Sequence, residues 1–359
     1  MSAPGLAELE EAPHPALARL RERAPVAWVD ALGGWLVLTR NLAEAVMRDA
    51  ASFTVDDPRF STGRVVGSSM LSTDGAEHDA HRAPWVAPFR PGAVRDWLAG
   101  AVRAEADALL GALAPRGHGD LRSELAGPLA AETMRHALGL EDTGPGRLLE
   151  WYRAIVASVT AVTAGEGPTP EGAAAVAALR AALPGGTSAP DAAVVLFGGI
   201  ETTEGMIANM LWHLLSERAC FARVAADRNL VSVAVEESLR LEPAASVVDR
   251  YATRDVVLGG AEIRAGDLVR VSLAAANRDP AHVTEPDAFD LDRPATERRH
   301  LTFARGPHIC LGAHLARLEG RVALEAVLDW LPGLRLAEPT TPRGLVFRKP
   351  DALRVAWDV

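Results

Sequence analysis

The sequence predicts a mainly α-helical chain with small β-sheets. Apolar residues recur with helical spacing over most of residues 94–330, whereas short alternating segments beside glycine pairs occur at 25–39 and 255–272. No linker, low-complexity run or fixed-period repeat divides the 359 residues, of which 48% are hydrophobic. We therefore expect residues 1–359 to form a single domain with a large core.

Charge and cysteine content exclude several classes of protein. The net charge of −10 argues against a nucleic-acid partner. The two cysteines, Cys220 and Cys310, lie too far apart in sequence to indicate a disulfide framework. Residues 1–16 lack the pattern of a signal peptide, and polar residues interrupt the longest apolar segment, 192–215. We expect a cytoplasmic protein without a membrane span, and a monomer.

The first elements in the chain are a hairpin and a helix. Strand formers on either side of Gly33-Gly34 predict a hairpin over 25–39, and a helix is expected at 42–50. Residues 54–71 show no sustained period and are rich in Gly, Ser, Pro and Asp, so we predict a loop.

The next helix is predicted to begin at Asp74. His78 and Arg82 are four residues apart and share one face of it. They could bind one anionic group together, or they could form an ordinary surface pair.

Successive helices are predicted at 94–113, 121–138 and 148–163. A Gly/Pro break at 165–170 and an Ala-rich helix at 171–183 lead to a long helix at 191–216. Gly198-Gly199 and Thr202-Thr203 interrupt the middle of that helix, and each glycine costs it roughly 1 kcal/mol relative to alanine. A kinked core helix would explain such a sequence, and so would a functional site.

The last helices are predicted at 230–241, which carries Glu237 and Arg240 three residues apart, and at 311–330. Residues 255–272 predict a hairpin around Gly259-Gly260. Cys310 immediately precedes the final helix, whose N-terminal N–H groups favour a thiolate. A lone cysteine cannot complete a structural zinc site or hold an iron–sulfur cluster, but haem iron accepts a single thiolate. The alternative is a small buried hydrophobic side chain.

Phe303, Gly306, Cys310 and Gly312, at these spacings, resemble the haem-binding signature of the cytochromes P450. Two more segments resemble motifs of that family and occur in its order. Residues 198–203 resemble its oxygen-binding helix, and Glu237-x-x-Arg240, with Arg293 as the third member, resembles its Glu-x-x-Arg motif. The resemblance covers most of the chain and implies the cytochrome P450 fold, with haem b as cofactor. Between residues 140 and 190 the chain is shorter than typical members, which implies a shortened lid.

The resemblance also implies a role for individual residues. Cys310 would be the iron ligand, and Thr202 and Glu201 would be catalytic, because dioxygen must take up two protons before its O–O bond breaks. Glu237, Arg240 and Arg293 would be structural, and residues 54–71 would cover the substrate. The remaining cofactor-binding candidates are His78, Arg82, Gly198, Gly199, Arg250, Phe303, Gly306, His308 and Gly312; the substrate-pocket candidates are Leu196, Phe197, Ala245, Val247 and Val248.

The implied reaction is insertion of one oxygen atom from O₂ into a small or medium-sized organic substrate, free or carrier-bound, in secondary metabolism. Electrons would come from NAD(P)H through a ferredoxin reductase and a ferredoxin, which could dock on a basic patch that includes Arg305 and Arg317. Three alternatives remain open: a non-hydroxylating oxidation such as desaturation, coupling or rearrangement; peroxide-driven chemistry; and a haem-thiolate ligand sensor. Glu201 and Thr202 favour the use of dioxygen.

Overall fold

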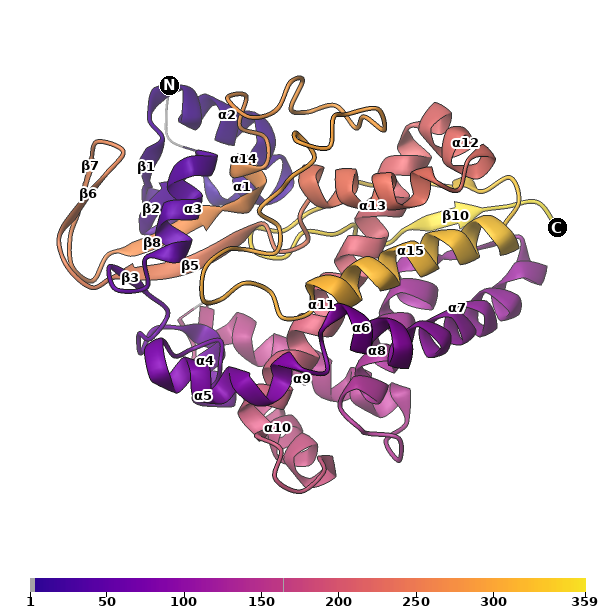
Figure 1. Ribbon diagram of the computed structural model, residues 1–359, viewed down its shortest axis with the longest axis horizontal. Helices are drawn as coiled ribbons and strands as arrows, with labels where there is room; N and C mark the ends of the chain where they lie inside the picture. The colour runs from indigo at the N-terminus through magenta and orange to yellow at the C-terminus, as the bar shows by residue number, and fades with distance from the viewer. Residues whose placement is uncertain (1–3, 164) are drawn as a thin grey trace.

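The computed structural model describes residues 4–163 and 165–359. It is mainly helical with small sheets, which confirms the predicted fold class (Figure 1). The α-helices are α1 (Leu6–Glu11), α2 (Pro13–Arg23), α3 (Arg40–Arg48), α4 (Ser61–Val66), α5 (Gly75–Val86), α6 (Pro91–Ala93), α7 (Ala99–Leu113), α8 (Gly127–Ala137), α9 (Pro145–Thr163), α10 (Pro170–Ala182), α11 (Ala189–Ser216), α12 (Arg218–Ala226), α13 (Leu230–Leu241), α14 (Leu273–Ala276) and α15 (Ala313–Trp330). π-Helical turns at Val94–Leu98 and Arg122–Ala126 precede α7 and α8.

Helix α11 runs through the centre of the helical region, and most of its side chains are buried (Figure 1). It begins with Ser188 as its N-cap, whose side chain accepts from the Asp191 N–H. Residues without large side chains bring other helices close to it: Gly199 lies against Met134 of α8, and Gly320 of α15 lies against Met206. Helix α15, which follows the cysteine loop, is therefore packed directly on α11.

The strands of the main sheet lie at the left of Figure 1, whereas β10 of a second sheet lies at the right. The main sheet has the order β1-β2-β8-β5-β3, formed by β1 (Val26–Val29), β2 (Gly34–Val37), β8 (Leu268–Ser272), β5 (Val247–Ala252) and β3 (Phe53–Thr54). Strands β1 and β2 form the predicted hairpin. A second sheet joins β4 (His118–Asp120), β10 (Arg354–Ala356) and β9 (Arg335–Leu336).

The hairpin predicted over 255–272 is shorter than expected. Only β6 (Val256–Leu258) and β7 (Ala261–Ile263) pair around Gly259-Gly260. Strand β8 instead pairs in parallel with β2 and antiparallel with β5. Local alternation identified a strand in β8 but could not identify its partners, because they lie far away in sequence.

The loop predicted over 54–71 was also only partly right, because it contains the helix α4. This helix is only six residues long and packs against α9, so tertiary contact stabilises a segment whose composition indicates a loop. The predicted helices on either side of 165–170 are present as α9 and α10. None of the described helices is both long and apolar enough to cross a membrane.

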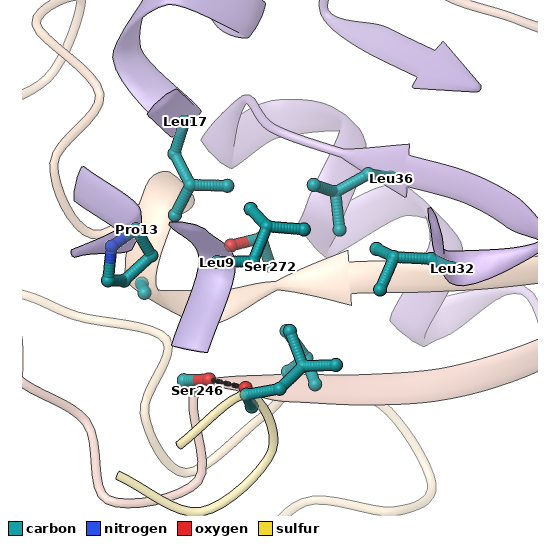
Figure 2. A pocket seen from close by; sticks show the side chains of 10 residues that line it. Leu9, Pro13, Leu17, Leu32, Leu36, Ser246 and Ser272 are labelled. Carbon is teal, nitrogen blue, oxygen red and sulfur yellow. Dashed lines mark hydrogen bonds between the residues drawn. The ribbon is translucent and has the colours of Figure 1, made fainter. Parts of the chain in front are cut away.

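A cavity of about 10 Å³ lies where α1 and α2 meet the main sheet (Figure 2). Leu9, Leu17 and Leu36 line it, and the Ser246 hydroxyl beside it donates to the Leu345 carbonyl. Its volume is about that of one water molecule, so we regard it as a packing gap rather than a ligand site.

Candidate active site

The cysteine loop, residues 301–312, is held by its own backbone. The Cys310 N–H donates to the Phe303 carbonyl over 2.8 Å, and Gly312 is the N-cap of α15. Phe303 packs under Arg317, whose guanidinium carbon lies 4.5 Å from the centre of the ring. These contacts fix Cys310 at the start of α15, where the sequence predicts it.

Gly306 fastens this loop to helix α3. Its φ angle is +75°, and a Cβ atom added there would lie 2.3 Å from the Met47 carbonyl oxygen. The neighbouring Ala304 also has a positive φ, of 57°. Gly306 is thus required for close packing on α3, whereas a Cβ at Gly312 would meet no atom within 4 Å.

The Cys310 thiol has exposed surface, yet protein surrounds it closely enough that burial raises its pKa. A hydrogen bond from Gly312 N–H and the cations Arg82 and Arg317 lower the pKa, but only in part. The hydrogen bond at the helix N-terminus favours the thiolate, but burial outweighs it and leaves the pKa of Cys310 above its usual range.

Two predicted cofactor ligands, His78 and His308, lie side by side, with ring centres 4.5 Å apart. The His308 Nε2 is 2.8 Å from an Asp74 carboxylate oxygen. Burial raises the pKa of Asp74, but hydrogen bonds from His308, Thr54 and the Val55 N–H outweigh it and hold the pKa well below its usual range. His78 is 2% exposed, and its Nε2 has no hydrogen-bond partner among the described residues.

The predicted arginines also contain unused donors. Arg82 donates to the Ile309 carbonyl over 2.7 Å, one residue before the cysteine. Arg250 is 5% exposed, and within residues 4–163 and 165–359 its guanidinium donates only to the Asp249 carbonyl, over 2.7 Å. Burial lowers the pKa of Arg250, and the charges of Asp74 and Asp249 offset this only in part. A guanidinium buried in this way requires an anionic partner.

The two glycines in the middle of α11 have different roles. A Cβ at Gly198 would meet no atom within 4 Å, whereas a Cβ at Gly199 would lie 2.1 Å from the Met134 sulfur. Gly198 therefore faces open space, and Gly199 permits helix packing. The Thr202 hydroxyl donates to the Gly198 carbonyl over 2.6 Å, a bond from residue i to i−4 that widens a helix locally.

Glu201 is 6% exposed and has two partners that could not be predicted from the sequence. One of its oxygens is 2.7 Å from the Lys349 Nζ atom, and the other accepts from the Tyr152 hydroxyl. Tyr152 belongs to α9, and Lys349 lies in the C-terminal segment. The acid of the predicted acid–alcohol pair is thus held by an ion pair and a hydrogen bond.

Glu237, Arg240 and Arg293 form a buried ion-pair cluster, with side chains 0%, 0% and 2% exposed. Arg240 and Arg293 each approach a Glu237 carboxylate oxygen to 2.8 Å. Their remaining N–H groups donate to carbonyls of residues 277–288. The cluster joins α13 to the irregular segment that leads to the cysteine loop.

The substrate-pocket candidates do not share one surface. Leu196 and Phe197 are buried in α11, and Phe197 makes an edge contact with Phe347, with ring centres 5.3 Å apart. Ala245 forms a backbone bridge with the same Phe347. Val247 lines the small cavity of Figure 2, and Val248 packs on the core of the main sheet.

These residues fit a haem. His78 offers a buried ring nitrogen and Arg250 a buried guanidinium, both of which need acceptors such as the two propionates of haem b. Gly198 and Gly312 both face open space, which a flat macrocycle requires near its surface. Cys310 would supply a single thiolate ligand.

Comparison with known proteins agrees with this geometry. The family model for Cytochrome P450 matches residues 191–330. The 20-oxo-5-O-mycaminosyltylactone 23-monooxygenase of Streptomyces fradiae is 32% identical over 379 residues, covering 95% of this chain and 88% of that protein. Nocardicin C N-oxygenase of Nocardia uniformis subsp. tsuyamanensis is 33% identical over 392 residues, covering 96% and 95%.

Among solved structures, P450BioI in complex with an acyl carrier protein that bears hexadec-9Z-enoic acid is similar, with a TM-score of 0.88 and 26% identity. The match covers 98% of this chain and 100% of that one. The chain belongs to the cytochrome P450 family. It is a cytochrome P450 monooxygenase, and its cofactor is haem b.

Proposed function

We propose that this enzyme inserts one oxygen atom from O₂ into a small or medium-sized apolar substrate of secondary metabolism, with Cys310 as the iron ligand. The main support is the packing of α15, which begins just after Cys310, on α11, whose Gly198 faces open space and whose Thr202 supplies a hydroxyl. The names of the two curated relatives, a 23-monooxygenase of a tylactone and an N-oxygenase of nocardicin C, support this substrate class.

Bound haem b supplies the redox chemistry that activates dioxygen. His78, Arg82, Arg250 and His308 would hold its propionates, and each charge would then have a buried partner. The Thr202 hydroxyl, whose hydrogen here goes to the Gly198 carbonyl, would turn to donate a hydrogen bond into the reaction space. Glu201, the next residue toward the N-terminus, would renew that proton from outside.

An acidic electron donor would bind beside the start of α15. A recess of about 390 Å³ lies between the turn after α6, α13 and α15, and it is lined by Arg95, Arg317, Arg321 and Glu236. Arg317 pairs with Glu236 over 2.5 Å and Arg95 with Asp96 over 2.9 Å, so among the described residues the positive surplus of this recess comes from Arg321. Arg305 belongs to the neighbouring cysteine loop. This charge favours a ferredoxin, reduced by NAD(P)H through its reductase.

The substrate could be free or attached to a carrier protein. P450BioI is the structural relative that supports the second form, because its structure contains a fatty acyl group ligated to an acyl carrier protein. A substrate library should therefore hold free acids, macrocycles and amino-acid derivatives together with carrier-bound thioesters.

Turnover under ¹⁸O₂ with a surrogate ferredoxin and reductase tests the proposal. We expect one ¹⁸O atom in the product and NAD(P)H consumption that the substrate stimulates. Product formed with hydrogen peroxide alone would indicate the peroxide-driven alternative. Substrate binding without any electron uptake, across the whole library, would instead indicate a sensor.

A further inference from the structure

Lys349 occupies an unusual place, between two carboxylates of the central helix. Its Nζ atom lies 2.7 Å from a Glu201 oxygen and 2.8 Å from a Glu204 oxygen. The three side chains are 15%, 7% and 9% exposed, so these contacts are largely shielded from water. Ion pairs in such surroundings are held much more firmly than those at the surface.

The backbone that carries Lys349 is fixed along one face of α11. The Asn209 side chain donates to the Arg348 carbonyl over 2.9 Å, and the Trp212 ring N–H donates to the Thr340 carbonyl over 2.7 Å. A Cβ at Gly205 would lie 3.0 Å from the Ala244 Cβ and 3.4 Å, an ordinary contact distance, from the Arg348 carbonyl oxygen, so the segment also lies against this residue. Residues 201, 205, 209 and 212 follow one another at helical spacing, so they form a single stripe beneath the C-terminal segment.

The outer carboxylate has its own cationic partner. The Arg122 Nε donates to Glu204 over 2.9 Å, and this arginine is 27% exposed. Arg122 also donates to the Asp351 carbonyl, which ties it to the same C-terminal segment. Two carboxylates and two cations therefore alternate from the more exposed Arg122 through Glu204 and Lys349 to Glu201.

We propose that Lys349 is a positioning residue for proton delivery: its ion pair holds the Glu201 carboxylate in one place on α11, and Glu204 holds Lys349 in place. The proposal rests on the proposed function of Glu201. Glu201 can then pass inward a proton that arrives from outside, and the contact with Lys349 returns its carboxylate to the same place. The Tyr152 hydroxyl bonds to the other oxygen and sets the orientation of the carboxylate.

The test compares the haem-loaded wild type with Lys349→Met, which keeps the aliphatic stem and removes the charge. We expect the infrared carboxylate bands of Glu201, identified by their loss in Glu201→Gln, to shift in Lys349→Met as the carboxylate loses its ion pair. We also expect the solvent isotope effect on NAD(P)H oxidation, measured with surrogate redox partners, to grow about twofold or more as proton delivery becomes limiting. Lys349→Arg should restore both signals toward wild type.

The matched control is Arg354→Met, which removes a surface partner of Glu338 from the same C-terminal region. The proposal is overturned if Lys349→Met and Arg354→Met give the same infrared spectrum and isotope effect. Adding Glu204→Gln to Lys349→Arg should reduce the restoring effect of the arginine, because Glu204 then no longer holds the cation at position 349. The reduced carbon monoxide spectrum is recorded for every variant: an abnormal wild-type spectrum refutes the proposed function, whereas a normal one with no response at Lys349 refutes only this inference.

Discussion

Replacing Glu237 by Gln should strongly destabilise the fold around the cysteine loop. Its carboxylate accepts from Arg240 Nε and Nη2 over 3.0 and 2.8 Å, from Arg293 Nε over 2.8 Å and from the Asp290 N–H over 3.2 Å. The change leaves the fully buried Arg240 without its carboxylate partner. Arg293 keeps its bonds to carbonyls and one carboxylate contact, with Glu297 at 3.5 Å. The amide nitrogen of Gln would also face an arginine donor.

Breaking a buried ion pair by removing one partner costs about 3–5 kcal/mol, and we expect a loss in that range for Glu237→Gln. Urea unfolding followed by circular dichroism measures it. Asp292→Asn is the matched control, because Asp292 lies in the same segment but pairs with Arg223 at the surface, with 72% of its side chain exposed. A loss below about 1 kcal/mol, or a shift equal to that of the control, would contradict this account of the cluster.

Three further changes have defined outcomes. Thr202→Ala should lower product per NAD(P)H and raise released peroxide by about tenfold or more, and unchanged coupling would remove its assigned role. Gly306→Ala should lower the free energy of urea unfolding by about 2–4 kcal/mol, because the new Cβ clashes with the Met47 carbonyl and alanine is strained at this positive φ. Gly266→Ala has a similar φ of +87° and no atom within 4 Å, so it measures the cost of φ alone; equal losses would exclude the clash. Burial lowers the pKa of His213 to about 3, whereas the unfolded chain binds that proton below about 6.5. Stability should therefore fall by on the order of 1 kcal/mol per pH unit from 6.5 toward 3, and His213→Gln should flatten that slope. Identical slopes would show that another group controls it.

The helices of the core were largely predictable, because long apolar patterns determine which face is buried. Residues 230–241 match α13 at both ends, and α11 begins two residues before the predicted start. Segments whose structure depends on distant partners were not predictable. Helix α4 forms because α9 covers it, and β8 joins β2 and β5 across long stretches of sequence.

The candidate site shows the same division. Residue spacing within each motif predicted the positions of Cys310, Thr202 and the Glu237 cluster. The loop and the helices preserve the geometry that this spacing implies. It could not reveal Lys349 or Tyr152, which reach Glu201 from other elements. The sequence indicated Asp74 only as the residue at which a helix begins. Its contact with His308 depends on the fold of the cysteine loop.

The absorption spectrum of the reduced protein with carbon monoxide, compared between wild type and Cys310→Ser, tests the central assignment most directly. We predict the long-wavelength Soret band of a thiolate-bound carbonyl in the wild type and its loss in the variant. A protein that purifies without haem despite haem supplementation, or a spectrum that is the same with and without the Cys310 sulfur, would contradict the site assigned to this chain.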